Sequence, residues 1–279
     1  MTTLPSEPEQ AARAEHFLAL HQPGTPLLMP NAWDVGSARL FAFLGCEAIA
    51  STSGGFAASR GRLDGAMSRE EVLSHCGDLV SAVEIPVSAD LEDCFADDPA
   101  GVAATITAAK EQGLAGGSVE DFTRNRDEPI YELAQAAERV QAAAEAAHAG
   151  AVRFVLTARA ENYLHGRKDL ADTIARLQAY QEAGADVLFA PRVVEPAELR
   201  RLLAEVELPV SVLVTPHAPS VPELADLGVS RISVGGAIAA ASYGFAVTAV
   251  KQLRDEGTTN YWDAAAAARD DMLSAFVSP

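Results

Sequence analysis

The chain has 279 residues, of which 49% are hydrophobic, and its formal net charge is −18. The length suits one α/β barrel, which typically needs about 250 residues. A chain with this much negative charge repels a phosphate backbone, and we therefore expect it not to bind nucleic acid. A solvated acidic surface accounts for the charge, which by itself names no substrate.

Three cysteines, Cys46, Cys76 and Cys94, show no C-x-x-C spacing, which indicates a reducing compartment. The first residues are rich in Pro and Glu and lack a basic region followed by an apolar one, so we expect no signal peptide. The apolar stretches are strand-length or broken by charge, so no membrane span is expected. These features predict a cytoplasmic protein without a membrane partner.

Short apolar runs alternate with longer amphipathic runs along the chain. An N-terminal helix is predicted over about residues 6–22, and amphipathic helices over residues 68–83, 99–112, 130–147 and 168–183. A capping-box pattern starts at Ser68, and Gly113 and Gly184 follow the ends of two of these helices. Strands are predicted at residues 27–29, 48–51, 87–91, 117–120, 154–158, 187–190, 210–214 and 231–234.

Eight strands, nearly every one followed by a helix, predict a parallel sheet closed into a (β/α)8 TIM barrel. A doubly wound open sheet is the competing fold, but no G-x-G-x-x-G follows the first strand. No linker or low-complexity segment divides the chain, so we expect one domain over residues 1–279. The active site of such a barrel lies at the C-terminal ends of its strands, so the polar residues that follow each strand are the candidates.

Acidic residues stand at the ends of two consecutive predicted strands. Asp90 and Glu92 are two apart in a segment that we interpret as extended, so their side chains should point the same way, and Glu120 ends the next strand. Neighbouring carboxylates are costly unless they are protonated or bind a cation. An all-oxygen set suits Mg²⁺ or Mn²⁺. Surface acids or structural salt bridges are the alternative, but the placement favours a metal.

The segment Ser53-Gly54-Gly55 could hold an anion, because glycines let backbone N–H groups approach a carboxylate or phosphate closely. Arg159 could bind a substrate carboxylate with two hydrogen bonds, or pair with the acids, or do both. Trp33, at the end of the first strand, could form a wall of the pocket or pack at the rim of the core. These residues predict an anionic substrate.

Several segments together resemble the isocitrate lyase / phosphoenolpyruvate mutase superfamily over nearly the whole chain. The segments that carry the resemblance are Pro30-Asn31-Ala32-Trp33-Asp34, Ser53-Gly54-Gly55, Gly61-Arg62-Leu63-Asp64, Ala89-Asp90-Leu91-Glu92, Val119-Glu120-Asp121 and Thr157-Ala158-Arg159. The resemblance implies a barrel whose eighth helix is exchanged between subunits of a homodimer or homotetramer. The C-terminal helical region, about residues 243–279, would be the exchanged part.

The resemblance also implies a Mg²⁺ site for 2-oxo acids or dicarboxylates. By position, Ser53, Gly54 and Gly55 would hold the substrate carboxylate or phosphonate, and Arg159 would bind the carboxylate. Asp64 would lie beside the metal and the reacting group. The metal shell would include Asp90 and Glu120.

Three departures from the family pattern bear on function. Ser88 stands where the family often has a metal-binding Asp, so Glu92 is the predicted substitute ligand. The Lys-Lys/Arg-Cys-Gly-His loop of the lyases is absent, and residues 122–127 follow the fourth predicted strand instead. The resemblance therefore does not predict isocitrate or methylisocitrate lyase activity. The mutases have a longer loop here, with an Asn that contacts the phosphoryl group. In the shorter loop of this chain, Asn125 is the candidate for that role.

The function predicted from these residues is a Mg²⁺-dependent lyase, decarboxylase or hydrolase that acts on a small 2-oxo acid through an enolate. Phosphoenolpyruvate mutase or phosphonopyruvate hydrolase activity is the first alternative. A 2-oxo acid binding protein with little catalysis is an alternative of another class.

Overall fold

The first strand of the barrel is broken in two at Pro30. In the computed structural model, which describes residues 4–277, β1 (Leu27–Met29) pairs in parallel with β9 (Arg231–Ser233), whereas β2 (Asn31–Ala32) pairs with β3 (Ile49–Ser51). Pro30 has no N–H to donate, but its carbonyl accepts the N–H of Ala50 at 3.0 Å, on the β3 side. The sheet order is β1-β9-β8-β7-β6-β5-β4-β3-β2, and the ring closes because β1 and β2 are consecutive parts of one strand.

The side chain of Asn31 spans this break. Its Nδ2 donates to the carbonyl of Ser51 at 2.8 Å, on the β3 side. Its Oδ1 accepts the N–H groups of Val234 at 3.0 Å and Gly235 at 2.8 Å, on the β9 side. One amide thus links the first strand to both of its neighbours, in addition to the backbone pairing.

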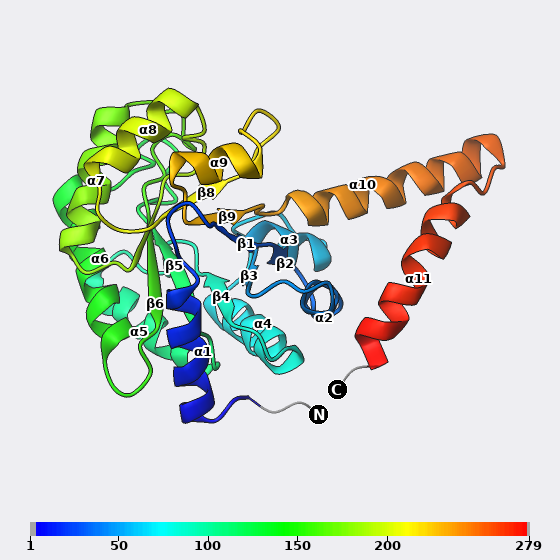
Figure 1. The fold of residues 1–279 in the computed structure, drawn as a ribbon, viewed down its shortest axis with the longest axis horizontal. Coiled ribbons are helices and arrows are strands. Elements are labelled where there is room, and N and C mark those ends of the chain that lie inside the picture. The colour runs from blue at the N-terminus through cyan, green and yellow to red at the C-terminus, as the bar shows by residue number, and fades with distance from the viewer. Residues whose placement is uncertain (1–3, 278–279) are drawn as a thin grey trace.

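All eight predicted strands and the (β/α)8 barrel are confirmed, while the short β2 was not predicted (Figure 1). The remaining strands are β4 (Val87–Asp90), β5 (Gly116–Glu120), β6 (Val155–Arg159), β7 (Val187–Phe189) and β8 (Val210–Leu213). The helices that precede or surround the barrel are α1 (Glu7–Ala19), α2 (Val35–Phe43), α3 (Ser53–Ser59), α4 (Arg69–Ala82), α5 (Pro99–Glu111), α6 (Leu133–His148), α7 (Leu170–Glu182), α8 (Pro196–Glu205) and α9 (Val221–Leu227). None of the helices in the described part of the chain has the length and apolar character needed to cross a membrane.

Helix α1 contributes to a buried apolar cluster with the strands. Ala14 and Phe17 of α1 lie against Leu27, Val155 and other small apolar residues. Phe17 sits so close to β5 that a Cβ atom on Gly116 would lie 2.8 Å from its ring. A larger cluster fills the space between the strands and the outer helices. The barrel is thus packed on its outside and against α1.

The C-terminal helices extend away from the barrel (Figure 1). Helix α10 (Ala237–Lys251) leaves the barrel after β9, a π-helical turn η1 (Gln252–Glu256) follows, and α11 (Tyr261–Val277) runs back. The far end of α11 contacts α2, where Ala275 is buried and Arg39 Nη1 donates to the carbonyl of Phe276 at 3.4 Å. The helical region predicted over about residues 243–279 begins earlier in the structure, at Ala237, and its exchange between subunits remains a prediction; residues 278–279 lie outside the described residues.

We predict that Gly116→Ala destabilises the fold by about 1–3 kcal/mol, as overpacked cores do. The added Cβ would lie 2.6 Å from the carbonyl oxygen of Val155, so strand β5 would have to shift. Gly36→Ala is the matched control, because its Cβ would meet neighbouring atoms only at 3.5 Å or more. Urea unfolding compares the two variants, and equal stabilities would contradict the close packing at Gly116.

Candidate active site

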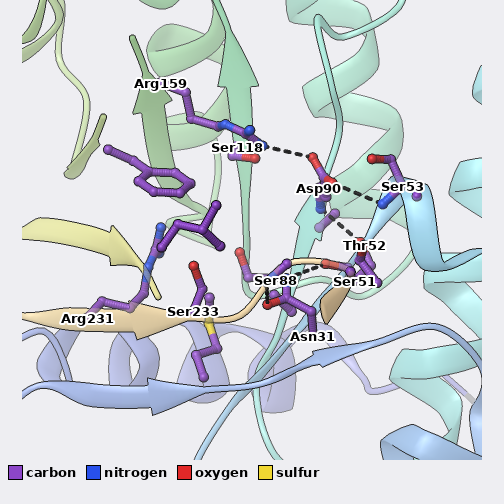
Figure 2. Close-up of a pocket in the computed structure, with 18 of the residues that line it drawn as sticks. Asn31, Ser51, Thr52, Ser53, Ser88, Asp90, Ser118, Arg159, Arg231 and Ser233 are labelled. Carbon is purple, nitrogen blue, oxygen red and sulfur yellow. Dashed lines mark hydrogen bonds and ion pairs between the residues drawn. The ribbon is translucent and has the colours of Figure 1, made fainter. Parts of the chain in front are cut away.

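A cavity of about 260 Å³ lies at the C-terminal ends of the strands and extends into the barrel (Figure 2). Five of the predicted site residues line it: Ser53, Gly54, Asp64, Asp90 and Arg159. The other four predicted residues, Trp33, Gly55, Glu92 and Glu120, are not part of the lining. The structure therefore brings the centre of the predicted site together and places the rest around it.

Arg159, the last residue of β6, pairs with three carboxylates at once. Its Nη1 lies 3.1 Å from Asp90 Oδ1 and 2.9 Å from Glu120 Oε1, and its Nε lies 2.7 Å from Glu161 Oε1. Burial lowers the pKa of Arg159, but the three acids outweigh burial and hold the pKa above its ordinary value. The guanidinium is therefore permanently charged, and three acids share its one positive charge.

This sharing leaves the acids only partly compensated. Burial, and then repulsion from Glu161 and Asp90, hold the pKa of Glu120 well above its ordinary value despite Arg159. Burial likewise raises the pKa of Glu161, whose Oε2 is buried without a hydrogen-bond partner. Glu161 was not among the predicted site residues, although its position two residues after Arg159 could have indicated it.

Asp90 fixes the start of α3. Its Oδ2 accepts the N–H of Ser53 at 3.0 Å, and its own N–H donates to Ser51 Oγ at 2.8 Å (Figure 2). The N-cap residue Thr52 accepts the N–H of Gly55 at 3.3 Å. Of the three N–H groups in the predicted anion cradle, two are thus bound within the protein and that of Gly54 remains.

The two glycines of this turn have different roles. A Cβ on Gly54 would lie 3.2 Å from Asp64 Oδ2, so the small residue lets this carboxylate approach the turn. A Cβ on Gly55 would lie 2.6 Å from Thr52 Cγ2 and 2.9 Å from Trp33 Cβ, so Gly55 is required for packing. Trp33 itself packs edge-on against Phe41, with 6.1 Å between ring centroids.

The geometry predicted for Glu92 is wrong. Strand β4 ends at Asp90, and Glu92 lies in a turn with a φ of 51°. The chain between them is not extended, so the rule that side chains two residues apart point the same way does not apply. Arg124 Nη2 lies 3.2 Å from Glu92 Oε2, whereas Oε1 is buried without a partner. Burial, followed by repulsion from Asp90, raises the pKa of Glu92 to about 7. Glu92 still lies close enough to Asp90 for their charges to interact.

Arg124 is a second basic residue that the sequence did not single out. Its Nε and Nη2 reach Asp93 at 2.6 and 2.7 Å, and the residue has a φ of 61°. It lies in the short loop after β5, for which the sequence offered only Asn125. Asn125 is exposed, and its Oδ1 accepts the N–H of Asp127 at 3.0 Å.

The carboxylates of Asp90, Glu92 and Glu120 suit Mg²⁺, although they do not form a complete set of metal ligands. Among residues 4–277, no three His, Cys, Asp or Glu side chains lie close enough together to hold a metal ion by themselves. Magnesium prefers oxygen ligands, retains several waters and often binds through only one or two carboxylates. The unpartnered, buried Glu92 Oε1 and the raised pKa values of Glu92 and Glu120 mark a place that a cation would stabilise. The residues present therefore fit the ion.

We predict that Glu92→Gln stabilises the metal-free protein at pH 8 but not at pH 5. The pKa of about 7 in the folded state lies above the ordinary value of 4.5, so Glu92 favours folding below pH 4.5 and loses that contribution as the pH rises through 7. Glutamine cannot ionise, so the melting temperature of the variant should exceed that of the wild type by about 3 °C or more at pH 8. Calorimetry at both pH values checks this, with Glu70→Gln as the exposed control. An equal difference at both pH values would contradict it.

Comparison with known proteins identifies the family of this chain. The family model for phosphoenolpyruvate phosphomutase matches residues 17–254. The uncharacterized protein Rv1998c of Mycobacterium tuberculosis (strain ATCC 25618 / H37Rv) is 32% identical over 220 residues, which cover 78% of this chain and 81% of that protein.

Two solved structures extend the comparison. A Burkholderia cenocepacia J2315 protein, named provisionally as a lyase/mutase, is 48% identical, with a TM-score of 0.92 and 98% of each chain covered. A phosphonopyruvate hydrolase shares the fold at 22% identity, with a TM-score of 0.81 and 94% of each chain covered. The chain therefore belongs to the phosphoenolpyruvate phosphomutase family, within the isocitrate lyase / phosphoenolpyruvate mutase superfamily.

Proposed function

We propose that the protein is a Mg²⁺-dependent enzyme that cleaves a carbon–carbon bond of a small 2-oxo acid, between the carbon next to the 2-oxo group and its substituent. The observation that carries this proposal is the meeting of Asp90, Asp64, Arg159 and the first turn of α3 in one cavity. At about 260 Å³ the cavity lies just below the usual range of ligand sites, about 300–1,000 Å³, so it suits a small substrate.

Relatives support the chemistry of this proposal. The superfamily contains lyases, mutases and hydrolases of small oxo acids. The structurally similar phosphonopyruvate hydrolase was crystallised with oxalate and Mg²⁺, a small dicarboxylate together with the metal that we propose here.

The proposed roles follow from the contacts. Of Asp90, Glu92 and Glu120, one or two would hold Mg²⁺ directly and the rest through bound waters, and the ion when bound supplies a Lewis acid that polarises the 2-oxo group. Arg159 would bind the substrate carboxylate, because among the described residues its Nη2 has no partner while Nε and Nη1 are occupied. The Gly54 N–H and the Ser53 hydroxyl would donate to the same anion.

The bond that breaks joins C3, the carbon next to the 2-oxo group, to its substituent. The substituent leaves as the electron-deficient fragment, for example as CO2 when it is a carboxylate, and the electron pair stays on C3, which gives an enolate. The fixed charge of Arg159 would stabilise the negative charge that develops there. A proton must then reach that carbon, and solvent is the proposed source. Cys94 is a poor donor because it is buried, and burial raises the pKa of its thiol. Asp64, exposed at the cavity rim beside Gly54, would face the reacting group.

Carbon–phosphorus chemistry is the second candidate, because the matching family model is that of phosphoenolpyruvate phosphomutase. Phosphorus NMR of the protein with phosphonopyruvate and Mg²⁺ separates the two. A new phosphorus signal would favour the mutase or the hydrolase over the carbon–carbon enzyme. Tight Mg²⁺-dependent binding of 2-oxo acids without turnover across a broad panel would instead favour a binding protein.

We predict that Asp90→Ala lowers Mg²⁺-dependent turnover of 2-oxo acids by at least about 100-fold, the usual loss when one group that stabilises a transition state is removed. The variant loses a proposed metal ligand and the acceptor for the Ser53 N–H. Turnover across a panel of 2-oxo acids, with and without a chelator, measures the effect. Asp127→Ala, in the exposed loop after β5, is the control. Unchanged metal binding and turnover in Asp90→Ala would refute the proposed site.

We also propose that the arm formed by α10 and α11 packs against a second copy of the chain. Many large apolar side chains of the arm are exposed: Tyr243, Phe245, Val247, Val250, Leu253, Trp262, Met272 and Leu273. Extended exposed apolar surface usually marks an interaction site. A homodimer or homotetramer would cover these side chains.

The double variant Val250→Glu, Leu253→Glu should therefore dissociate the oligomer into monomers, because two charges cannot be buried in an apolar contact without partners. Size-exclusion chromatography with light scattering measures the mass of each species. Lys251→Glu, an exposed charged position on the same arm, is the control that changes charge without removing apolar surface. A wild-type protein that is monomeric at micromolar concentration would contradict the proposal.

A further inference from the structure

Arg231 is a buried cation inside the barrel that has no acidic partner. It is the first residue of β9 and is 3% exposed. Its Nε donates to Ser211 Oγ at 2.9 Å, and its Nη1 donates to Thr157 Oγ1 at 3.0 Å. Among the described residues it forms no ion pair, and no hydrogen bond reaches its Nη2.

The remaining neighbour of Arg231 is a neutral histidine. His21 Nε2 lies 3.3 Å from Arg231 Nη1, and His21 Nδ1 lies 2.8 Å from the carbonyl of Phe17. With its proton on Nδ1, the imidazole donates to that carbonyl, and Nε2 can accept a hydrogen bond from Arg231. Burial, followed by the positive charge of Arg231, lowers the pKa of His21 to about 3. The imidazole therefore adds no negative charge, and the charge of Arg231 stays uncompensated.

Arg231 remains charged at neutral pH. Burial, followed by the nearby positive charge of Arg159, lowers the pKa of Arg231 to about 9. A buried cation without a partner is costly, and proteins normally pair such a group or use it. The structure thus retains a charge that its own side chains do not neutralise.

This charge lies on the wall of the active-site cavity. Arg231 lines the cavity together with Arg159, and in Figure 2 it approaches from the side opposite to Asp90 and Ser53. Serine side chains line the wall as well, at positions 51, 88, 118 and 233. The inner end of the cavity is therefore polar and positively charged, whereas its mouth carries the acids.

We propose that Arg231 is a specificity-determining residue that binds a second carboxylate of the substrate at the inner end of the cavity. This inference rests on the proposed function, because it assumes that the 2-oxo acid end lies near Asp90 and Arg159. The preferred substrate is then a small 2-oxo diacid, and the corresponding monoacid leaves the charge of Arg231 unpaired. The free Nη2 and the hydroxyls of the wall supply the donors for the second carboxylate.

The experiment compares diacids with monoacids of equal chain length. Isothermal titration in the presence of Mg²⁺ measures the Kd of 2-oxoglutarate against 2-oxopentanoate, and of oxaloacetate against 2-oxobutanoate. The wild type should bind each diacid at least about tenfold more tightly than its partner. Arg231→Met should weaken diacid binding by about 10- to 100-fold, the usual effect of losing hydrogen bonds to a charged group. Its monoacid Kd should change less than about twofold on the same reasoning.

Two further variants keep the test independent of folding. Arg231→Lys retains the charge and should recover part of the diacid preference. Ser233→Asp leaves Arg231 in place and adds a carboxylate two residues along the same strand face, where it would neutralise Arg231 and remove the preference. Arg201→Met, which breaks the exposed ion pair with Glu205, is the control and should change neither Kd.

The outcomes separate this inference from the proposed function. If the wild type with Mg²⁺ binds no member of either pair, the proposed function is wrong and the inference falls with it. If the wild type binds both members of a pair, and Arg231→Met and Ser233→Asp change the Kd of the diacid and that of the monoacid equally or not at all, the proposed function stands. In that case Arg231 has only a structural role, through Ser211, Thr157 and His21.

Discussion

One guanidinium shared by three carboxylates is the interaction on which the site depends. Arg159 holds Asp90, Glu120 and Glu161 together at hydrogen-bond distance in a mostly buried place. Breaking a buried ion pair by removing one partner usually costs about 3–5 kcal/mol, so the acids could not be gathered there without the arginine. Because acids outnumber the cation, the cluster retains negative charge that a divalent ion can balance.

This imbalance has a counterpart at the other end of the cavity. The mouth holds more acids than bases, whereas the inner end holds Arg231 without an acid. The charge therefore changes sign along the cavity, from the acids at the strand ends to the base within the barrel. A molecule that coordinates a cation at one end and presents an anion at the other would suit both ends, and electrostatic complementarity of this kind contributes mainly to specificity.

The barrel could be predicted well from the sequence because each strand is a short apolar run with an amphipathic helix behind it. β2 was missed because a two-residue strand after a proline carries no pattern of its own. Within the predicted site, Asp90, Arg159, Asp64, Ser53 and Gly54 line one cavity, since strand ends of a parallel barrel converge.

The failures depend on geometry that the sequence does not display. The orientation of Glu92 was wrong because alternation holds only in an extended chain, and the chain turns left-handed there. Arg231 was missed because an arginine in an apolar run carries no sign of burial. Its partners, Ser211 and Thr157, come from other strands and meet it only when the ring closes.

The first strand of the barrel changes its backbone partner at Pro30. The backbone of β1 pairs with β9 and that of β2 pairs with β3, and the side chain of Asn31 adds hydrogen bonds to both of these neighbours. The N–H groups of Val234 and Gly235 are bound by the Asn31 amide, so they report on the opening of these contacts in hydrogen exchange. Gly235 and Gly236 also line the cavity. Opening of the Asn31 contacts would therefore loosen the active-site wall while both backbone ladders stay paired.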